Sequence, residues 1–416
     1  MNPKKMLLGI GTGVGLGLLL RTIAPSAAWA TWCNENLAFF LGQLFLRLLF
    51  MLVIPMIVSA LVVGIAGMEL SRLGRLGVRT LIYTVVVSGI AVLIGIVLVN
   101  LVQPGAGHSE ILRALAERGS TVAAAPLPPS TRTIDLLVGM IPNNFIAVAA
   151  NGDMIGVIVF SVIFAIAASL TPSEPARRLV DWMQGLYDIM MTCIAAVMRL
   201  APIGVGALMF SMTFRLGADL LRPLAAYVAV VIGGILLHMF GTYSILLKVM
   251  ARRSPMAFFR ASRLAMTTAF STASSSASLP AALKVADEEL KLPKGPSHFV
   301  LTVGASMNQN GTALFEGITV LFLAQLYGVP LSLGQQVLVM GISILGGVGT
   351  AGVPAGSLPV IAMILAMLKI PPESLGLILG VDRFLDMCRT TLNVMGDLVA
   401  AAVLSATEPD GSSNES

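Results

Sequence analysis

Hydrophobic runs recur from one end of the chain to the other, separated by short polar or basic segments. The early runs lie at about 6–22, 38–68, 78–102, 136–170, 184–212 and 222–250. A helix of about 20 apolar residues is long enough to cross the hydrocarbon core of a bilayer. The pattern therefore predicts an all-α polytopic membrane protein.

Beyond about residue 255 the pattern changes, because two apolar stretches are interrupted in the middle. Met266–Leu283 has a serine cluster at its centre, and Gly341–Leu365 is rich in glycine and contains Pro354. Irregular backbone at membrane depth is tolerated only where protein buries it or water reaches it. Two re-entrant helical hairpins meet that condition, and each precedes a span that carries polar groups. We therefore predict a hairpin-plus-span unit that occurs twice with inverted topology.

The composition agrees with a membrane location. Hydrophobic residues make up 56% of the chain and charged residues 11%, with a mean hydropathy of +0.90, whereas soluble domains carry about 25% charged residues. The net charge of +5 comes from short loops and ends such as Lys4–Lys5 and Arg177–Arg178. The positive-inside rule assigns these to the cytoplasmic side, so the charge does not indicate nucleic-acid binding. We expect a plasma (inner) membrane protein with both termini in the cytoplasm.

The N-terminal segment and the cysteine and histidine residues are less specific indicators. The first 20 residues, followed by Ser26–Ala30, have the layout of a signal peptide, although a first transmembrane helix explains them as well and fits the polytopic remainder. The three cysteines and three histidines are too scattered for a disulfide framework or a metal cluster. We therefore expect no metal cofactor.

The last apolar segment carries five polar residues on one helical face. They are spaced 4, 3, 4 and 4 apart: Asp382, Asp386, Arg389, Asn393 and Asp397. Ionisable groups inside a membrane are costly and usually face a bundle interior or an aqueous path. A cytoplasmic amphipathic helix and a purely structural ion-pair network are the alternatives, but the apolar flanks favour a ligand or ion site.

The chemistry of this face suits a substrate with charges of both signs. Arg389 offers a fork of donors that matches a carboxylate, and Asp386 could accept an ammonium group. Asn393 could hold the α-carboxylate or the amine, and Asp397 could serve a cation. Together they suit an amino acid with a side-chain carboxylate.

Both predicted hairpins have tips that could approach a ligand. Ser271–Pro280 presents hydroxyls and free backbone N–H groups, which suit a carboxylate. A serine nucleophile would need a placed base, which the sequence does not offer, so we predict that the protein is not an enzyme. The glycines of Gly346–Gly356 permit close backbone approach or gating, although a helix-packing surface would look similar.

The chain resembles the dicarboxylate/amino acid:cation symporters, which include archaeal aspartate transporters and mammalian excitatory amino acid transporters. The resemblance covers nearly the whole chain and is strongest in four segments: "SSSASLP" (Ser274–Pro280), "NQNGTALFEG" (Asn308–Gly317), "GTAGVPAG" (Gly349–Gly356) and "DMCRTTLNVMGD" (Asp386–Asp397). It implies eight transmembrane helices, two re-entrant hairpins, a homotrimer and an elevator mechanism.

The resemblance also implies which segments of the chain form each domain. Residues 1–77 and 136–221 would form a scaffold, and residues 78–103 and 222–404 a transport domain. Residues 104–135 would be an outer loop, and 405–416 a disordered cytoplasmic tail.

The same resemblance implies site residues. For the substrate they are Arg389, Asp386, Asn393, Thr390, Thr312, Ser274, Ser275, Ser276, Val353 and Gly356. For cation coupling they are Asp397, Asn308, Gly304, Asn393 and Glu316. Because the chain keeps both Arg389 and Asp386, aspartate or glutamate is the leading substrate.

The chain departs from the family where members usually have Asn-Met-Asp-Gly-Thr. Gln309 and Asn310 replace the methionine and the aspartate near sodium sites. The third span has Thr84 and Val87 where tyrosine and threonine are usual, although Ser88 is kept, and Gly347 stands where serine is common. Without the carboxylate we expect sodium coupling to be weakened or absent, and the amide nitrogen of Gln309 could reach into the vacated site.

Glu316 is the candidate for a group that couples transport to protons in place of sodium. Sodium-only archaeal members usually have glutamine there, whereas proton- and potassium-coupled relatives have glutamate. Burial disfavours the charged form of a carboxyl group, so Glu316 could exchange a proton; the alternative is that it pairs with a neighbour. An arginine of many members is missing, since its two usual positions are Ala273 and Met387.

We thus expect a secondary active transporter of acidic amino acids in the lipid bilayer, with H⁺ more than Na⁺ as coupling ion. The alternatives are a sodium symporter with rearranged sites, a C4-dicarboxylate transporter, an anion-conducting channel and an intramembrane hydrolase.

Overall fold

The computed structural model describes residues 3–25, 27–66, 74–107, 141–151, 154–349, 357–371 and 374–406, and these residues form helices and connecting turns without strands. The helices are α1 (Pro3–Ile23), α2 (Ala28–Trp32), α3 (Phe39–Phe50), α4 (Val53–Ala66), α5 (Gly74–Val102), α8 (Phe145–Asn151), α9 (Met154–Leu170), α10 (Glu174–Leu216), α11 (Leu221–Leu237), α12 (Tyr243–Val249), α13 (Pro255–Ala261), α14 (Arg263–Thr272), α15 (Ser275–Lys284), α16 (Lys294–Met307), α17 (Asn310–Leu326), α18 (Leu333–Gly349), α19 (Ser357–Met367) and α20 (Leu375–Ala406). The predicted all-α class is confirmed for this part of the chain.

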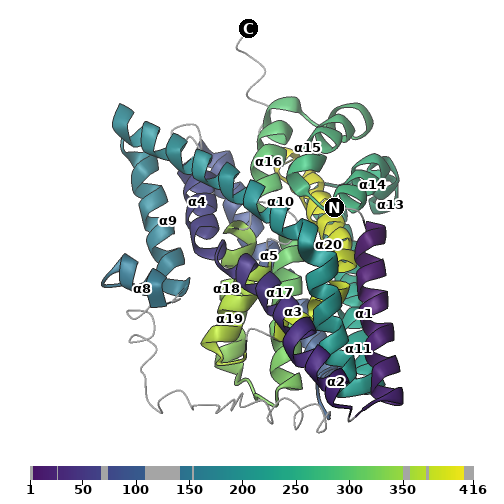
Figure 1. Ribbon diagram of the computed structural model, residues 1–416. Coiled ribbons are helices and arrows are strands. Elements are labelled where there is room, and N and C mark those ends of the chain that lie inside the picture. Colours follow the sequence, from purple (N-terminus) through teal and green to yellow (C-terminus); the bar gives the residue numbers. More distant parts are fainter. Residues whose placement is uncertain are drawn as a thin grey trace.

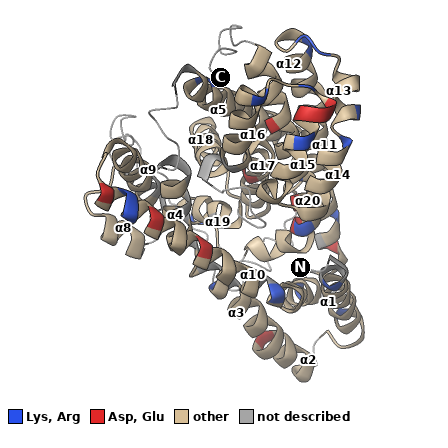
Figure 2. Cartoon of the chain, turned by 90° about the horizontal axis from the view of Figure 1, so that it is seen from above, with Lys and Arg blue, Asp and Glu red and all other residues tan. Residues whose placement is uncertain are grey.

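The first group of helices packs along α10, which is 43 residues long. Helices α1, α3 and α4 contact it directly, and α9 packs on α4. Seen from above, α8 and α9 lie near one end of α10 and α1–α3 toward the other (Figure 2). The axis of α10 bends by 51° between Glu174–Val197 and Arg199–Arg215. Pro202 explains the bend, because it cannot donate a hydrogen bond to the carbonyl of Met198.

Glycines bring α1 and α10 into backbone contact. A Cβ atom on Gly9 would overlap the carbonyl of Pro202, and one on Gly13 would overlap that of Gly206. Small residues at such spacing are the usual means by which membrane helices approach closely. The first helix is thereby held against the bent half of α10.

The second group contains the interior of the molecule. Helices α5, α11, α14, α16, α17, α18 and α20 contact one another. Helix α17 is buried on all its faces, and α20 is buried over most of its length. A helix that is apolar on every side belongs inside a bundle or a membrane. Polar groups on α17 and α20 are therefore shielded from water by protein.

The serine cluster interrupts the chain as its composition predicted. Helices α14 and α15 meet at Ala273, which adopts a left-handed conformation with φ 50°. Ser274 caps α15, since its Oγ accepts from the backbone N–H of Ala277 at 3.2 Å. Helices α18 and α19 form the second pair, and the residues between them, 350–356, lie outside the described residues. The two pairs lie toward opposite ends of the bundle, α14–α15 at the top and α18–α19 below (Figure 1).

Other boundaries differ from the hydrophobic pattern. The segment expected at 38–68 is two helices that part at Met51–Leu52, and the span expected at 184–212 is the longer α10. Most of the expected outer loop and tail fall outside the described residues. Among the described helices, Leu76–Val102, Gly217–Val249 and Leu375–Ala406 are long and apolar enough to cross a membrane, and the bent α10 could be a fourth. The number of eight spans, the re-entrant hairpins and the elevator motion stay predictions.

Candidate functional site

The polar face of α20 is buried. Asp382, Asp386, Arg389, Asn393 and Asp397 are each at most 5% exposed, and the adjacent threonine at position 390 is buried as well. The spacing correctly predicted that these side chains share an inward face. This burial excludes a solvated cytoplasmic amphipathic helix as the explanation for the pattern.

Arg389 is paired within its own helix. Its Nε donates to Asp386 Oδ1 at 3.0 Å, and its Nη1 donates to Asp382 Oδ1 at 3.2 Å. The guanidinium carbon lies 4.2 Å from the centre of the Phe315 ring on α17, where the face of the ring attracts a cation. A buried charge is costly unless it is paired. Arg389 and two carboxylates therefore lie side by side inside the bundle, and the guanidinium is paired with both.

Arg383 completes this cluster, and the sequence analysis missed it. Its Nη1 lies 3.5 Å from Asp386 Oδ2, so each oxygen of Asp386 faces an arginine. The Nε of Arg383 is buried and has no hydrogen-bond partner in the described part of the chain. The available signal was the spacing of three between Arg383 and Asp386, which makes them neighbours on a helix. Positions 273 and 387 carry no charge, and Arg383 supplies a second cation instead.

Asn393 fixes the break between α16 and α17. Asn308 and Gln309 leave the helical conformation, with ψ of 64° and 57°. The side-chain oxygen of Asn393 accepts from the N–H of Gly311 at 2.7 Å, and its nitrogen donates to Gln309 Oε1 at 2.5 Å and to Thr312 Oγ1 at 3.1 Å. One side chain thus satisfies the backbone N–H of Gly311 at the start of α17 and two side-chain oxygens beside the break. The amide nitrogen of Gln309 donates to the carbonyl of Ala305 at 3.0 Å.

Neutral groups surround Asn310. Its Oδ1 accepts from Ser88 Oγ at 2.6 Å, and its Nδ2 donates to the hydroxyl of Tyr243 at 2.9 Å. Tyr243 in turn donates to the carbonyl of Leu392 at 3.2 Å. Because the hydroxyl proton of Tyr243 is used there, the hydroxyl must accept from the amide. Where an aspartate would offer a second oxygen, Asn310 presents N–H hydrogens. Sequence reasoning did not find Tyr243, since a single tyrosine in an apolar span carries no signal.

The other altered positions are buried on α5 and α18. Thr84 and Val87 are each 2% exposed on α5, the helix whose Ser88 contacts Asn310. Gly347 on α18 lies against the break in α16–α17, because a Cβ there would be 3.2 Å from the carbonyl oxygen of Gln309.

Asp397 and Asn308 form a second polar pair. Asn308 Nδ2 donates to Asp397 Oδ1 at 3.0 Å, and Asn308 Oδ1 is buried without a partner in the described part of the chain. A Cβ on Gly304 would be 2.6 Å from the same carboxylate oxygen, so only glycine permits this approach. A carboxylate beside an unpartnered amide oxygen is a donor set that fits a hard cation. The coupling role of these residues stays a prediction.

Glu316 is fully buried, and both of its carboxylate oxygens lack a hydrogen-bond partner among the described residues. The expected alternative, pairing with a neighbour, is not observed there. One oxygen faces α18, because a Cβ on Gly346 would be 2.8 Å from Oε2. A buried carboxylate without hydrogen bonds is strongly disfavoured as the anion. A role for Glu316 in proton coupling stays a prediction.

The hairpin residues are only partly described. Ser275 is 2% exposed, and its Oγ has no partner among the described residues, so it is available to a ligand. Ser276 is exposed, and Ser274 is occupied as the cap of α15. Val353 and Gly356 lie outside the described residues. Substrate contacts at all these positions stay predictions.

Comparison with known proteins gives one consistent family. The model of the sodium:dicarboxylate symporter family matches residues 3–407. The chain is 34% identical to the "Proton/glutamate-aspartate symporter" of Escherichia coli over 97% of this chain and 92% of that protein. It is 32% identical to the "Proton/sodium-glutamate symport protein" of Bacillus caldotenax over 96% and 95% of the two chains. It is 30% identical to "Excitatory amino acid transporter 1" of Ambystoma tigrinum over 88% and 76%.

These matches confirm the resemblance that the four motifs indicated, and they confirm that the protein is a transporter rather than an enzyme. The chain belongs to the sodium:dicarboxylate symporter family.

Proposed function

We propose that the protein takes up L-glutamate or L-aspartate across the plasma membrane by an elevator mechanism, coupled mainly to protons. The observation that carries the choice of substrate is the buried pair of Arg389 with Asp386 on α20. The names of the relatives, which transport glutamate and aspartate, support it.

A zwitterion with a second carboxylate can exchange partners with this pair. Its side-chain carboxylate takes the guanidinium of Arg389, and its ammonium group takes a carboxylate oxygen of Asp386. Arg389 and Asp386 each keep an opposite charge in this way, and the α-carboxylate of the substrate is left to a hydrogen-bond donor such as the hydroxyl of Ser275. A C4-dicarboxylate has no ammonium group to pair with Asp386 once Arg389 binds the substrate. This disfavours a C4-dicarboxylate as the substrate.

The neutral network at Asn310 and the unpartnered Glu316 support proton coupling. Sodium in a dry site needs oxygen ligands and a nearby negative charge, whereas Asn310 offers N–H hydrogens on one side. Glu316 can carry a proton across as a neutral group and release it when α18, which carries Gly346, moves away from Glu316 and water enters. The alternative, a sodium symporter, is favoured by one observation, the free Oδ1 of Asn308 beside Asp397.

The mechanical part of the proposal follows the packing. We infer that residues 78–103 and 222–404 move as a transport domain against a scaffold of residues 1–77 and 136–221, with three copies in a trimer. The helices of the first group contact α10, and those of the second group contact α17 and α20. This division supports a sliding boundary between the two groups.

Uptake into proteoliposomes tests the function directly. We expect labelled glutamate or aspartate to accumulate under an inward proton gradient without sodium, and Arg389→Ala to lower the uptake about 100-fold, since loss of one partner of a buried charged pair costs about 3 kcal/mol. An imposed sodium gradient at equal pH should add little. Strict dependence on external sodium would contradict the coupling, and equal uptake by Arg389→Ala would contradict the pocket.

Glu316→Gln should separate binding from coupling. The amide resembles the protonated acid in shape, so substrate binding should stay close to that of the native protein. Uptake driven by a pH gradient should fall about tenfold or more, equivalent to about 1.4 kcal/mol, and the rate should lose its pH dependence. The matched control is Glu289→Gln on an exposed turn, which should keep both. Unchanged pH dependence in Glu316→Gln assigns the proton to another group.

Asn310→Asp should restore affinity for sodium. The new carboxylate would lie between Ser88 and Tyr243, where it is buried and lacks a cation, so the variant should be less stable than the native protein in choline chloride. Added sodium chloride should raise its melting temperature and its substrate affinity. The native protein and the exposed control Asn36→Asp should respond to the two salts alike. If the melting temperature and substrate affinity of Asn310→Asp were the same in sodium chloride and in choline chloride, the amide of Asn310 would not be what excludes sodium.

Arg383→Gln should change selectivity through Asp386. Arg383 faces the oxygen of Asp386 that a substrate amine would use, so its removal should favour substrates with an amine. We expect the ratio of aspartate affinity to succinate affinity to rise about fivefold, equivalent to about 1 kcal/mol, with Arg383→Lys close to the native ratio. Competition binding with the two compounds measures the ratio. An equal loss for both would mean that Arg383 only attracts carboxylates.

A further inference from the structure

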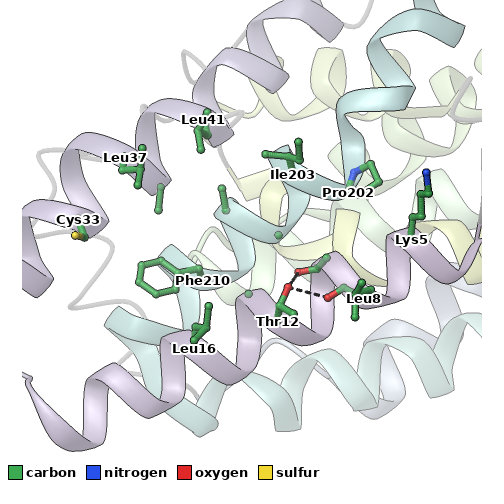
Figure 3. Close-up of a pocket in the computed structure, with 15 residues that line it drawn as sticks. Lys5, Leu8, Thr12, Leu16, Cys33, Leu37, Leu41, Pro202, Ile203 and Phe210 are labelled. Carbon is green, nitrogen blue, oxygen red and sulfur yellow. Dashed lines mark hydrogen bonds between the residues drawn. The ribbon is translucent and has the colours of Figure 1, made fainter.

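A cavity of about 530 Å³ lies between α1, the π-helix Cys33–Ala38 with the start of α3, and α10 from Pro202 onward. None of its lining residues is on α20, although Leu208 and Met209 of α10 contact that helix. Most of its lining is apolar, with Leu8, Leu16, Leu37, Leu41, Ile203 and Phe210 pointing around it (Figure 3). A volume of this size is typical of ligand pockets in proteins.

The polar groups of the cavity lie at its ends or are already used. Lys5 lies at one end and Cys33 at the other (Figure 3). Thr12 is in the middle, but its hydroxyl donates to the carbonyls of Leu8 and Gly9 in its own helix, at 2.8 and 3.0 Å. Along its length the cavity therefore offers no free donor, and a polar ligand would lose its hydrogen bonds with water there.

The cavity cannot close by a simple approach of its walls. Gly9 and Gly13 already hold the backbone of α1 against Pro202 and Gly206. Leu8, Leu16, Leu37 and Ile203 on its walls are each more than half exposed. An apolar occupant that covers them would therefore gain packing contacts.

The dimensions match one leaflet of a bilayer. Lys5 and Leu16 are separated along α1 by about 16 Å at 1.5 Å per residue, and half of the hydrocarbon core is about 15 Å. The positive-inside rule assigns Lys5 to the cytoplasmic surface. Trp29 and Trp32, beyond the opposite end of α1, are 57% and 60% exposed, as in the aromatic belt of the other surface.

We propose that this cavity binds one acyl chain of an anionic phospholipid from the cytoplasmic leaflet, with its phosphate at Lys5. The apolar walls accept the chain, and the ammonium group selects the charge of the head group. A basic residue at this depth adds to the affinity for anionic lipids. The bound lipid would fix α1 and α3 against α10 and would not take part in substrate binding.

Native mass spectrometry of the full-length, delipidated protein in detergent tests this, with phosphatidylglycerol and phosphatidylcholine as probes. We expect one tightly held phosphatidylglycerol per chain, bound about fivefold more strongly than phosphatidylcholine. Ala207→Phe, which fills the cavity, should abolish this binding. Lys5→Gln should keep a bound lipid but lose the preference for phosphatidylglycerol. The control Leu93→Phe, at an exposed position on α5, should change neither.

Three results would overturn the proposal. The first is unchanged lipid binding in Ala207→Phe, checked to be folded by its thermal unfolding. The second is an unchanged preference in Lys5→Gln, which does not alter the cavity walls. The third is a change of oligomer mass in Ala207→Phe, which would mean that a second copy of the chain covers the cavity. Because the measurement uses no transported substrate, its outcome is independent of the proposed transport function.

Discussion

The arrangement of the site depends on how the buried guanidinium of Arg389 is neutralised. A charge inside a bundle must be neutralised close by, and α20 does this with Asp386 and Asp382, one and two turns earlier. The pairing within one helix means that the guanidinium needs no carboxylate from α17, which contributes the ring of Phe315 to it instead. A ligand with both charges can then bind by exchanging partners with this pair.

The break between α16 and α17 depends on the same helix. Asn393 satisfies the polar groups of Gly311, Gln309 and Thr312, and so converts an interruption that would be costly in a membrane into a fixed feature. Beside it, Asn310 closes a network of neutral groups with Ser88 and Tyr243. A carboxylate at position 310 could attract a cation. The amide of Asn310 has its hydrogen bonds satisfied by Ser88 and Tyr243 without a cation. The carboxyl of Glu316, which has no hydrogen-bond partner among the described residues, lies six residues beyond Asn310 on α17, against α18.

Parts of this arrangement were predictable and parts were not. The spacing of the polar residues on α20 fixed which of them share a face, and the serine cluster marked the end of α14, because both are local properties of the chain. Tyr243 could not be found, since it reaches Asn310 from a helix about 70 residues away in sequence and its apolar neighbours give no signal. Arg383 had a signal in its spacing from Asp386, but its role depends on Arg389 already occupying the other oxygen. The bend of α10 is a local effect of Pro202, whereas the cavity beside it depends on how separate helices pack.

By itself, the sequence determined the class of the protein, the buried face of α20, the interruptions of its last helices and the family to which it belongs. Each of these depends on periodicity, composition or short motifs, which act over a few residues. Only the tertiary structure decided which groups satisfy one another: Asn310 with Ser88 and Tyr243, Asp397 with Asn308, and Glu316 with none among the described residues. The physical reason is that hydrogen bonding and burial are properties of the assembled bundle, where partners come from helices distant in sequence.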